Sequence, residues 1–164
     1  MSFPSLLLML GTLLVLQATF LDCIAINGIK PDVVMIFVIF NGFLLGPREG
    51  AFLGYAGGII QDLFVGSYLG LNALTLMLAG FLSGVCGERL YKENSLIVAV
   101  VTFFSSTASL SLYYILLRYL NINIHFIPAF LQIIIPTAFY SMLVVPLFYL
   151  RVYRSLIIKN KDVN

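Results

Sequence analysis

The stretch GPREGAFLGYAGGIIQDLFV, residues 46–65, decides how this chain folds. Every fourth residue from its start is a glycine, and the next step of four falls on an aspartate. On a helix these positions share one face. Glycines at this spacing let two membrane helices approach backbone to backbone, whereas a carboxylate at membrane depth needs a partner, a proton or water. The sequence therefore predicts a contact face that consists of Gly46, Gly50, Gly54, Gly58 and Asp62.

The composition indicates which solvent surrounds the chain. The 164 residues are 61% hydrophobic and 10% charged, and the mean hydropathy is +1.05. A water-soluble fold of this composition would expose far more apolar surface than soluble proteins tolerate. The sequence therefore predicts an all-α integral membrane protein. Because no polar stretch is long enough for a second domain, residues 1–164 are expected to form a single polytopic membrane domain.

Apolar runs separated by turn residues predict a six-helix transmembrane bundle. Asp32 is placed to begin the second helix and Asn94 to cap the fifth, because their side chains can accept hydrogen bonds from the first free amides. Pro136 and Pro146 predict kinks in the sixth helix, because each proline removes an internal hydrogen bond. The predicted helices cover about residues 5–21, 33–45, 50–65, 71–85, 95–119 and 128–150, with a turn at 46–49 and a charged loop at 87–94.

Lysine and arginine are unevenly distributed between the two ends of the predicted helices. Six spans with both termini in the cytoplasm place seven of the nine basic residues inside, which satisfies the positive-inside rule. Five spans would put the basic loop at Arg89 and Lys92 on the opposite side from the basic tail. Six spans are therefore preferred, with Arg48, Arg89, Lys92, Arg151, Arg154, Lys159 and Lys161 inside and Lys30 and Arg118 outside.

Sequence motifs for catalysis, cofactors and metals are absent. There is no glycine-rich loop followed by Lys-Ser or Lys-Thr, no His-Glu-x-x-His and no Gly-x-Ser-x-Gly. His125 falls in a predicted outer loop, and Cys23 and Cys86 lie near opposite ends of the bundle, so neither a zinc cluster nor a disulfide is expected. The basic residues sit at span ends, which gives nucleic-acid binding no support. We predict no enzyme activity, no cofactor and no metal.

Three acids, Asp22, Asp32 and Asp62, fall where they could lie inside the membrane. The first two are near helix ends and are expected at the interface. Asp62 has two interpretations: it is solvated close to the outer headgroups, or it is a structural clamp that holds the third and fourth helices at their turn. We favour the clamp, with Lys30, Arg118 or a neighbouring amide as its partner. The glycines also have two interpretations, packing inside the bundle, which is favoured, or docking another protein.

Several motifs between residues 30 and 85 resemble a known family, the rod shape-determining protein MreD family. The rest of the chain agrees with that family by length and hydropathy. Lys30 stands where many members have arginine, which keeps the charge but not a bidentate pairing geometry. The motifs are Lys30-Pro31-Asp32 before a short apolar helix, Gly46-Pro47-Arg48-Glu49-Gly50, then Gly54 and Gly58 before Asp62-Leu63, and Gly66-Ser67 before Leu69-Gly70.

The resemblance implies a non-enzymatic membrane scaffold of the bacterial elongation complex, which regulates cell shape from the cytoplasmic membrane. Family members are similar in fold to the six-helix substrate-binding (S) subunits of energy-coupling vitamin transporters, and they bind MreC. Through that complex they help couple MreB filaments to peptidoglycan synthesis by a transpeptidase and a glycosyltransferase. The family supplies no catalytic residues, so its motif positions are carried over only as candidates for helix packing or partner contact: Arg48, Gly50, Gly54, Gly58 and Asp62.

The alternative function is that of a small-molecule-binding subunit of a membrane transporter. Such a subunit needs a pocket with a few convergent polar groups. The candidates for these groups are Asp62, Asn41, Asn72 and Gln132. Nothing in the sequence specifies a ligand for them.

Overall fold

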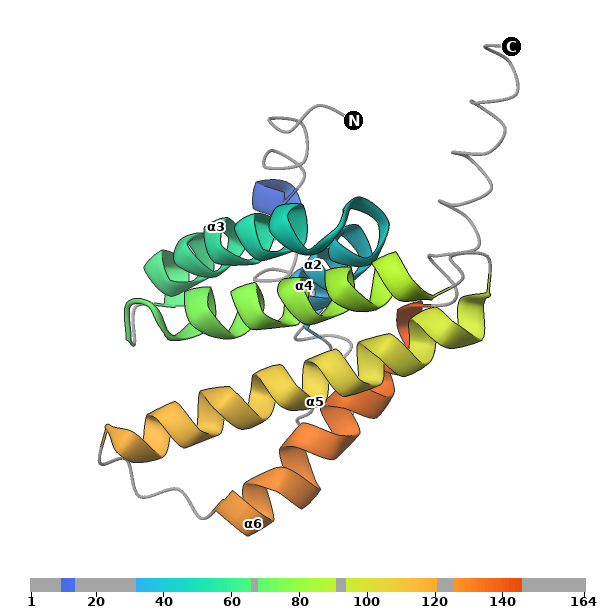
Figure 1. Cartoon of the computed structure of the whole chain (residues 1–164). Helices are drawn as coiled ribbons and strands as arrows, with labels where there is room; N and C mark the ends of the chain where they lie inside the picture. Colours follow the sequence, from blue (N-terminus) through green and yellow to red (C-terminus); the bar gives the residue numbers. More distant parts are fainter. Residues whose placement is uncertain (1–9, 14–31, 66–67, 91–93, 121–125, 146–164) are drawn as a thin grey trace, which may run out of the picture.

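A computed structural model of the chain describes residues 10–13, 32–65, 68–90, 94–120 and 126–145 (Figure 1). All regular elements within these ranges are helical, which confirms the predicted all-α class. Residues 10–13, the described part of the predicted first helix, are helical too. The other elements are α2 (Val33–Leu45), α3 (Pro47–Val65), α4 (Leu71–Arg89), α5 (Ser95–Tyr119), α6 (Phe126–Ala129) and the π-helix η2 (Phe130–Ile134), which continues as helix to residue 145.

Three helices in the described part of the chain are long and apolar enough to cross a membrane. They are Leu71–Arg89, Ser95–Tyr119 and Ile127–Val145. The apolar helix α2 has only 13 residues, so at about 1.5 Å per residue it is shorter than a hydrocarbon core of roughly 30 Å. The chain is therefore a membrane protein. Six spans remain a prediction, because α2 and α3 are not among these three helices, and most of the first and the end of the sixth predicted helix lie outside the described residues.

Two helices begin at the capping residues that the sequence predicts. Asp32 Oδ1 accepts a hydrogen bond from the Met35 amide at 3.0 Å, at the start of α2. Asn94 Oδ1 accepts one from the Leu96 amide at 3.0 Å, at the start of α5. Both caps satisfy an amide that has no partner within its own helix. The bounds of α2 and α5 coincide with the predicted ranges.

Helices α3 and α4 are longer than predicted. The expected turn at 46–49 consists of Gly46 alone. Its φ of 115° is not helical, so α2 ends there, and α3 begins at the next residue, Pro47. Proline suits a first turn because the amide it lacks would have no helical partner there. At the other end α4 continues through Gly87 to Arg89, which we expected in a loop. Gly87 is buried against the backbone of Phe43 on α2, so tertiary packing extends the helix.

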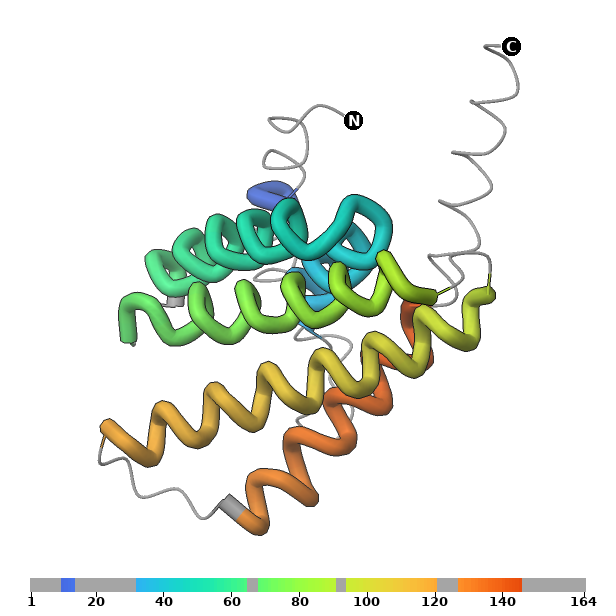
Figure 2. The backbone as a smooth tube through the Cα atoms, viewed as in Figure 1, coloured from blue at the N-terminus to red at the C-terminus, as the bar shows by residue number. Residues whose placement is uncertain are grey.

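The helices are layered around α2 and α4. Helices α3 and α4 run side by side in opposite directions, and α4 also contacts α2 and α5 (Figure 2). The last helix packs on α5. One apolar cluster joins α2, α3 and α4 around Val38, Leu53 and Leu76, and another joins α2 to α5 and the last helix around Phe43 and Val98. Helix α2 is apolar around most of its circumference, so it can pack into both clusters.

A π-helical turn lies just before Pro136, where the sequence predicts a kink. The amide of Ile135 donates to the Phe130 carbonyl five residues back. A proline has no amide to donate and its ring crowds the carbonyl four residues earlier, so a wider turn at this point relieves the conflict. The helix then continues to Val145. The second predicted kink, at Pro146, lies outside the described residues.

Candidate functional site

Three glycines of the predicted contact face, Gly50, Gly54 and Gly58, lie against the backbones of α4 and α2. The fourth, Gly46, does not share this close packing, because a Cβ there would lie 3.4 Å from the Glu49 side chain and 3.6 Å from the Glu88 side chain. A Cβ atom added to Gly54 would be 2.8 Å from the Met77 amide nitrogen, and one added to Gly50 would be 2.6 Å from the Gly42 Cα. Gly58 is equally close to the backbone of Ala73. Real Cβ atoms essentially never approach other atoms this closely. Only glycine fits at these positions, because backbone rather than side chain occupies the space beside each of them.

Small residues on α4 form the other half of this interface. Gly80 meets the backbone of Gly50, and Gly84 meets the backbone of Pro47 at the start of α3. Gly42, Gly50 and Gly80 lie against one another, so α2, α3 and α4 meet at this point. The α4 half of the interface was not predicted, although Gly80, Gly84 and Gly87 are spaced so that they share one helical face.

Asp62 accepts hydrogen bonds from three backbone amides at the start of α4. Its Oδ2 atom accepts from Gly70 at 2.8 Å and from Ala73 at 3.2 Å, and its Oδ1 atom accepts from Asn72 at 3.1 Å. The side chain is only 2% exposed. The interpretation of Asp62 as a solvated residue near the headgroups is therefore wrong. Its partners are backbone amides. A neighbouring amide was one of the three expected partners, beside Lys30 and Arg118.

This carboxylate replaces the cap that α4 lacks. The N-cap residue of α4 is Gly70, which has no side chain to accept a hydrogen bond and adopts a left-handed φ of 98°. The first amides of a helix carry partial positive charge and have no partner within the helix. Asp62 supplies the missing acceptor from the end of α3. The amides in turn compensate the burial of its negative charge.

Arg48 is separated from the other four predicted site residues. It is exposed, next to Glu49, in the first turn of α3. Glu88 and Arg89 are exposed at the adjoining end of α4. The predicted set thus divides into a packed face and one exposed arginine at the opposite end of α3 from Asp62.

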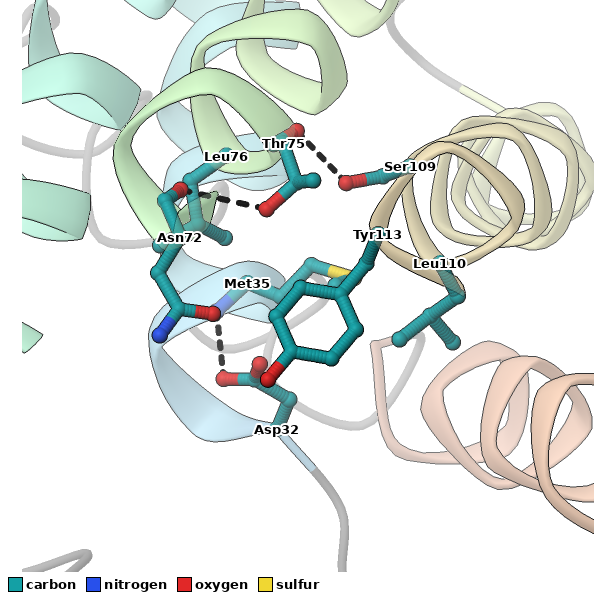
Figure 3. A pocket seen from close by; sticks show the side chains of 8 residues that line it. All are labelled: Asp32, Met35, Asn72, Thr75, Leu76, Ser109, Leu110 and Tyr113. Atoms are coloured by element: carbon teal, nitrogen blue, oxygen red, sulfur yellow. Dashed lines mark hydrogen bonds between the residues drawn. The ribbon is translucent and has the colours of Figure 1, made fainter. Parts of the chain in front are cut away.

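A cavity of about 170 Å³ lies beside the capped end of α4 (Figure 3). Asn72, whose amide binds Asp62, is one of its lining residues. Of the four polar residues proposed for a transporter subunit, Asn72 alone is in the lining: Asn41 is buried and donates to the Phe37 carbonyl at 2.8 Å, and Gln132 is exposed. The complete lining is Asp32, Met35, Asn72, Thr75, Leu76, Ser109, Leu110 and Tyr113.

The described residues contain no group of three or more His, Cys, Asp or Glu side chains that could hold a metal ion. Cys86 is a half-buried free thiol on α4. Asp22, Cys23, Lys30 and His125 lie outside the part of the chain that the structure describes.

Comparison with known proteins identifies one family. The sequence model of the family described as rod shape-determining protein MreD matches residues 1–157 of the 164-residue chain. Searches of curated proteins and of solved structures find no match. The family assignment therefore rests on nearly the whole length of the sequence.

Alanine substitutions in α3 test the glycine contacts. We expect Gly54→Ala and Gly58→Ala to lower stability by about 1–3 kcal/mol or more, because the new methyl group meets backbone that cannot yield without moving α4. Gly57→Ala is the matched control, because a Cβ there meets only the flexible end of the Leu10 side chain. Thermal unfolding of the purified variants measures the difference. Equal stability of Gly54→Ala and Gly57→Ala would contradict close packing.

Two substitutions at Asp62 test its role at the start of α4. Asp62→Asn keeps one acceptor oxygen but turns an N–H group toward a backbone donor, so we expect the stability to fall by about 1–3 kcal/mol. Asp62→Leu leaves all three backbone amides without an acceptor, so the stability should fall further. Glu49→Gln is the control, because Glu49 is an exposed carboxylate on the same helix. Thermal unfolding should rank wild type and the control above Asn, and Asn above Leu. If wild type, Asp62→Asn and Asp62→Leu unfold at the same temperature, Asp62 does not act as a clamp.

Proposed function

Because the chain belongs to the rod shape-determining protein MreD family, we propose that it is a non-enzymatic membrane scaffold of the bacterial elongation complex. Membership of the family implies a role in determining rod shape. The proposed scaffold binds MreC and helps couple MreB filaments to peptidoglycan synthesis by the transpeptidase and glycosyltransferase of that complex. The match over residues 1–157 is the observation that carries this proposal.

The packing of the described helices supports a scaffold role. Helices α2, α3 and α4 pack backbone to backbone at Gly42, Gly50 and Gly80, which favours one fixed arrangement of these helices. The glycine face of α3 is packed inside the bundle, so this face is not available to a partner. Arg48, which is exposed, remains the predicted partner-contact residue of the motif block.

The finer architecture belongs to the same proposal. We infer six spans in the bacterial cytoplasmic membrane, a fold similar to the S subunits of energy-coupling vitamin transporters, and cytoplasmic termini. The distribution of nine basic residues supports this orientation. A reporter that is active only in the cytoplasm, fused after Asn164, should be active. Activity of a reporter that works only outside the cytoplasm would reverse the assignment.

Deletion and complementation in the source bacterium test the proposed function. Loss of the gene should convert rods to rounded cells, and the wild-type chain should restore rods and retain MreC on purification. Gly57→Ala should behave like wild type, whereas Asp62→Leu should fail in both assays because the α3–α4 pair is destabilised. Rod shape that persists after deletion, or a stable chain that never retains MreC, would contradict the proposal.

A transporter subunit remains the alternative, and the cavity that includes Asn72 favours it. The other three polar residues named for that function do not line the cavity, so the scaffold is the better supported role. Energy-dependent uptake of a solute that requires this chain would reverse that order.

A further inference from the structure

The α3–α4 pair carries its exposed charges at one end only. Arg48 and Glu49 are exposed in the first turn of α3, and Glu88 and Arg89 are exposed in the last turn of α4. Between Glu49 and Glu88 the sequence contains a single charged residue, Asp62, and it is buried. Exposed charges belong in water or among lipid headgroups, because a charge in the hydrocarbon core is costly. The charged end of the pair therefore marks one membrane surface.

The opposite end of the pair exposes large apolar side chains. Figure 1 shows the end of α3 beside the start of α4 at this end. Leu63, Phe64 and Leu69 are 67–78% exposed, and Tyr68 is 44% exposed. Contact of these side chains with water is unfavourable, whereas contact with lipid acyl chains is favourable. We call these four residues the apolar end.

The pair is too short to carry its apolar end through the membrane. From Arg48 to Phe64, α3 rises about 24 Å at about 1.5 Å per residue. From Leu71 to Glu88, α4 rises about 26 Å. The hydrocarbon core is roughly 30 Å thick, and any tilt of the helices shortens their reach. With the charged end at one membrane surface, the apolar end lies within the lipid of the opposite leaflet.

Helix α5 differs from this pair because it is long enough to cross the core. It has 25 residues, and Arg118 is exposed close to its end. From Ser95 to Arg118 it rises about 35 Å, so it can carry this charge to the far headgroups. The hydrogen bond from Ser109 to the Thr75 carbonyl places the second half of α5 beside the first turns of α4. The two helix ends therefore lie on the same side, and only the longer helix carries an exposed charge there.

The backbone at the start of α4 makes its hydrogen bonds within the protein. Lipid offers no partner to a free amide, so a helix start at membrane depth has to satisfy its amides internally. The Leu71 amide donates to the Tyr68 carbonyl at 3.4 Å, and the Leu74 amide donates to the Gly70 carbonyl at 3.0 Å. Asp62 accepts from the other three amides of residues 70–74. This helix start therefore requires no water.

We propose that the apolar end of the α3–α4 pair is inserted in the phospholipid leaflet opposite the charged end and does not emerge into water. Acyl chains cover Leu63, Phe64 and Leu69, and Tyr68 lies near the headgroups, where amphipathic aromatic side chains are favoured. The buried cap then has a physical reason, because water is not present there to serve the first amides of α4. This inference is independent of the role in cell shape and of which leaflet is cytoplasmic.

Tryptophan fluorescence tests the insertion on the purified full-length chain, which contains no tryptophan of its own. Leu69→Trp places one reporter at the apolar end. Leu90→Trp is the matched control, because Leu90 is an exposed leucine directly after α4, at the charged end. In phosphatidylcholine nanodiscs, lipid with brominated acyl chains should quench Leu69→Trp. The uncharged aqueous quencher acrylamide should quench Leu69→Trp several times less than Leu90→Trp. Equal quenching of the two variants by acrylamide would overturn the proposal.

Phe64→Trp provides a second reporter at the apolar end. It exchanges one exposed aromatic side chain for another, so it keeps the test decisive if Leu69→Trp does not fold. It should show the same quenching by brominated lipid and the same protection from acrylamide. Thermal unfolding at the wild-type temperature checks that each reporter leaves the bundle intact. Protection from both quenchers would mean that protein covers the apolar end, which would also overturn the proposal.

Discussion

Three amides at the start of α4 converge on the carboxylate of Asp62, and the arrangement of the described helices depends on this contact. Gly70 cannot cap its own helix, so the acceptor has to come from elsewhere in the chain. Placing it four residues beyond Gly58 on α3 couples the direction of α4 to the face that carries the glycines. The cap thus holds the two helices at the end of the interface along which their backbones meet.

Close backbone contact matters more in a membrane than in water. Lipid is as apolar as leucine, so burying apolar side chains between helices contributes little there, and van der Waals contact and hydrogen bonds hold the helices together. Gly42, Gly50 and Gly80 let three backbones meet at one point, which increases the first of these contributions. The Asp62 cap and the bond from Ser109 to the Thr75 carbonyl provide the second. Helix α4 takes part in all of these contacts, and this explains its central position.

The sequence predicted features that depend on neighbours in the chain. Asp32 and Asn94 mark helix starts because capping is local, and the four-residue period of α3 shows a contact face without indicating what it contacts. Features that depend on tertiary packing were predicted only in part: the Asp62 clamp between the third and fourth helices was favoured, but its partner was left open. The continuation of α4 through Gly87 needs Phe43 of α2 beside it, and the amides that bind Asp62 become identifiable only once Gly70 is known to leave α4 uncapped. The cavity could not be predicted either, because its lining joins residues from Asp32 to Tyr113.

The two ends of the α3–α4 pair have different chemistry. Arg48 and Arg89 are exposed at one end, and the buried carboxylate and the cavity lie at the other. In the proposed orientation the first end faces the cytoplasm and the second faces outward. Two chemically distinct ends, with close backbone packing between them, are consistent with the proposed scaffold role.

Amide hydrogen exchange at the start of α4 tests the central claim most directly. In ¹⁵N-labelled protein in nanodiscs, the amides of Gly70, Asn72 and Ala73 should exchange slowly in the wild type, because each donates to Asp62. All three should exchange much faster in Asp62→Leu, while the Leu96 amide, capped by Asn94 at the other end of the bundle, should not change. Fast exchange of the three amides in the wild type, or slow exchange that persists without the carboxylate, would contradict the account.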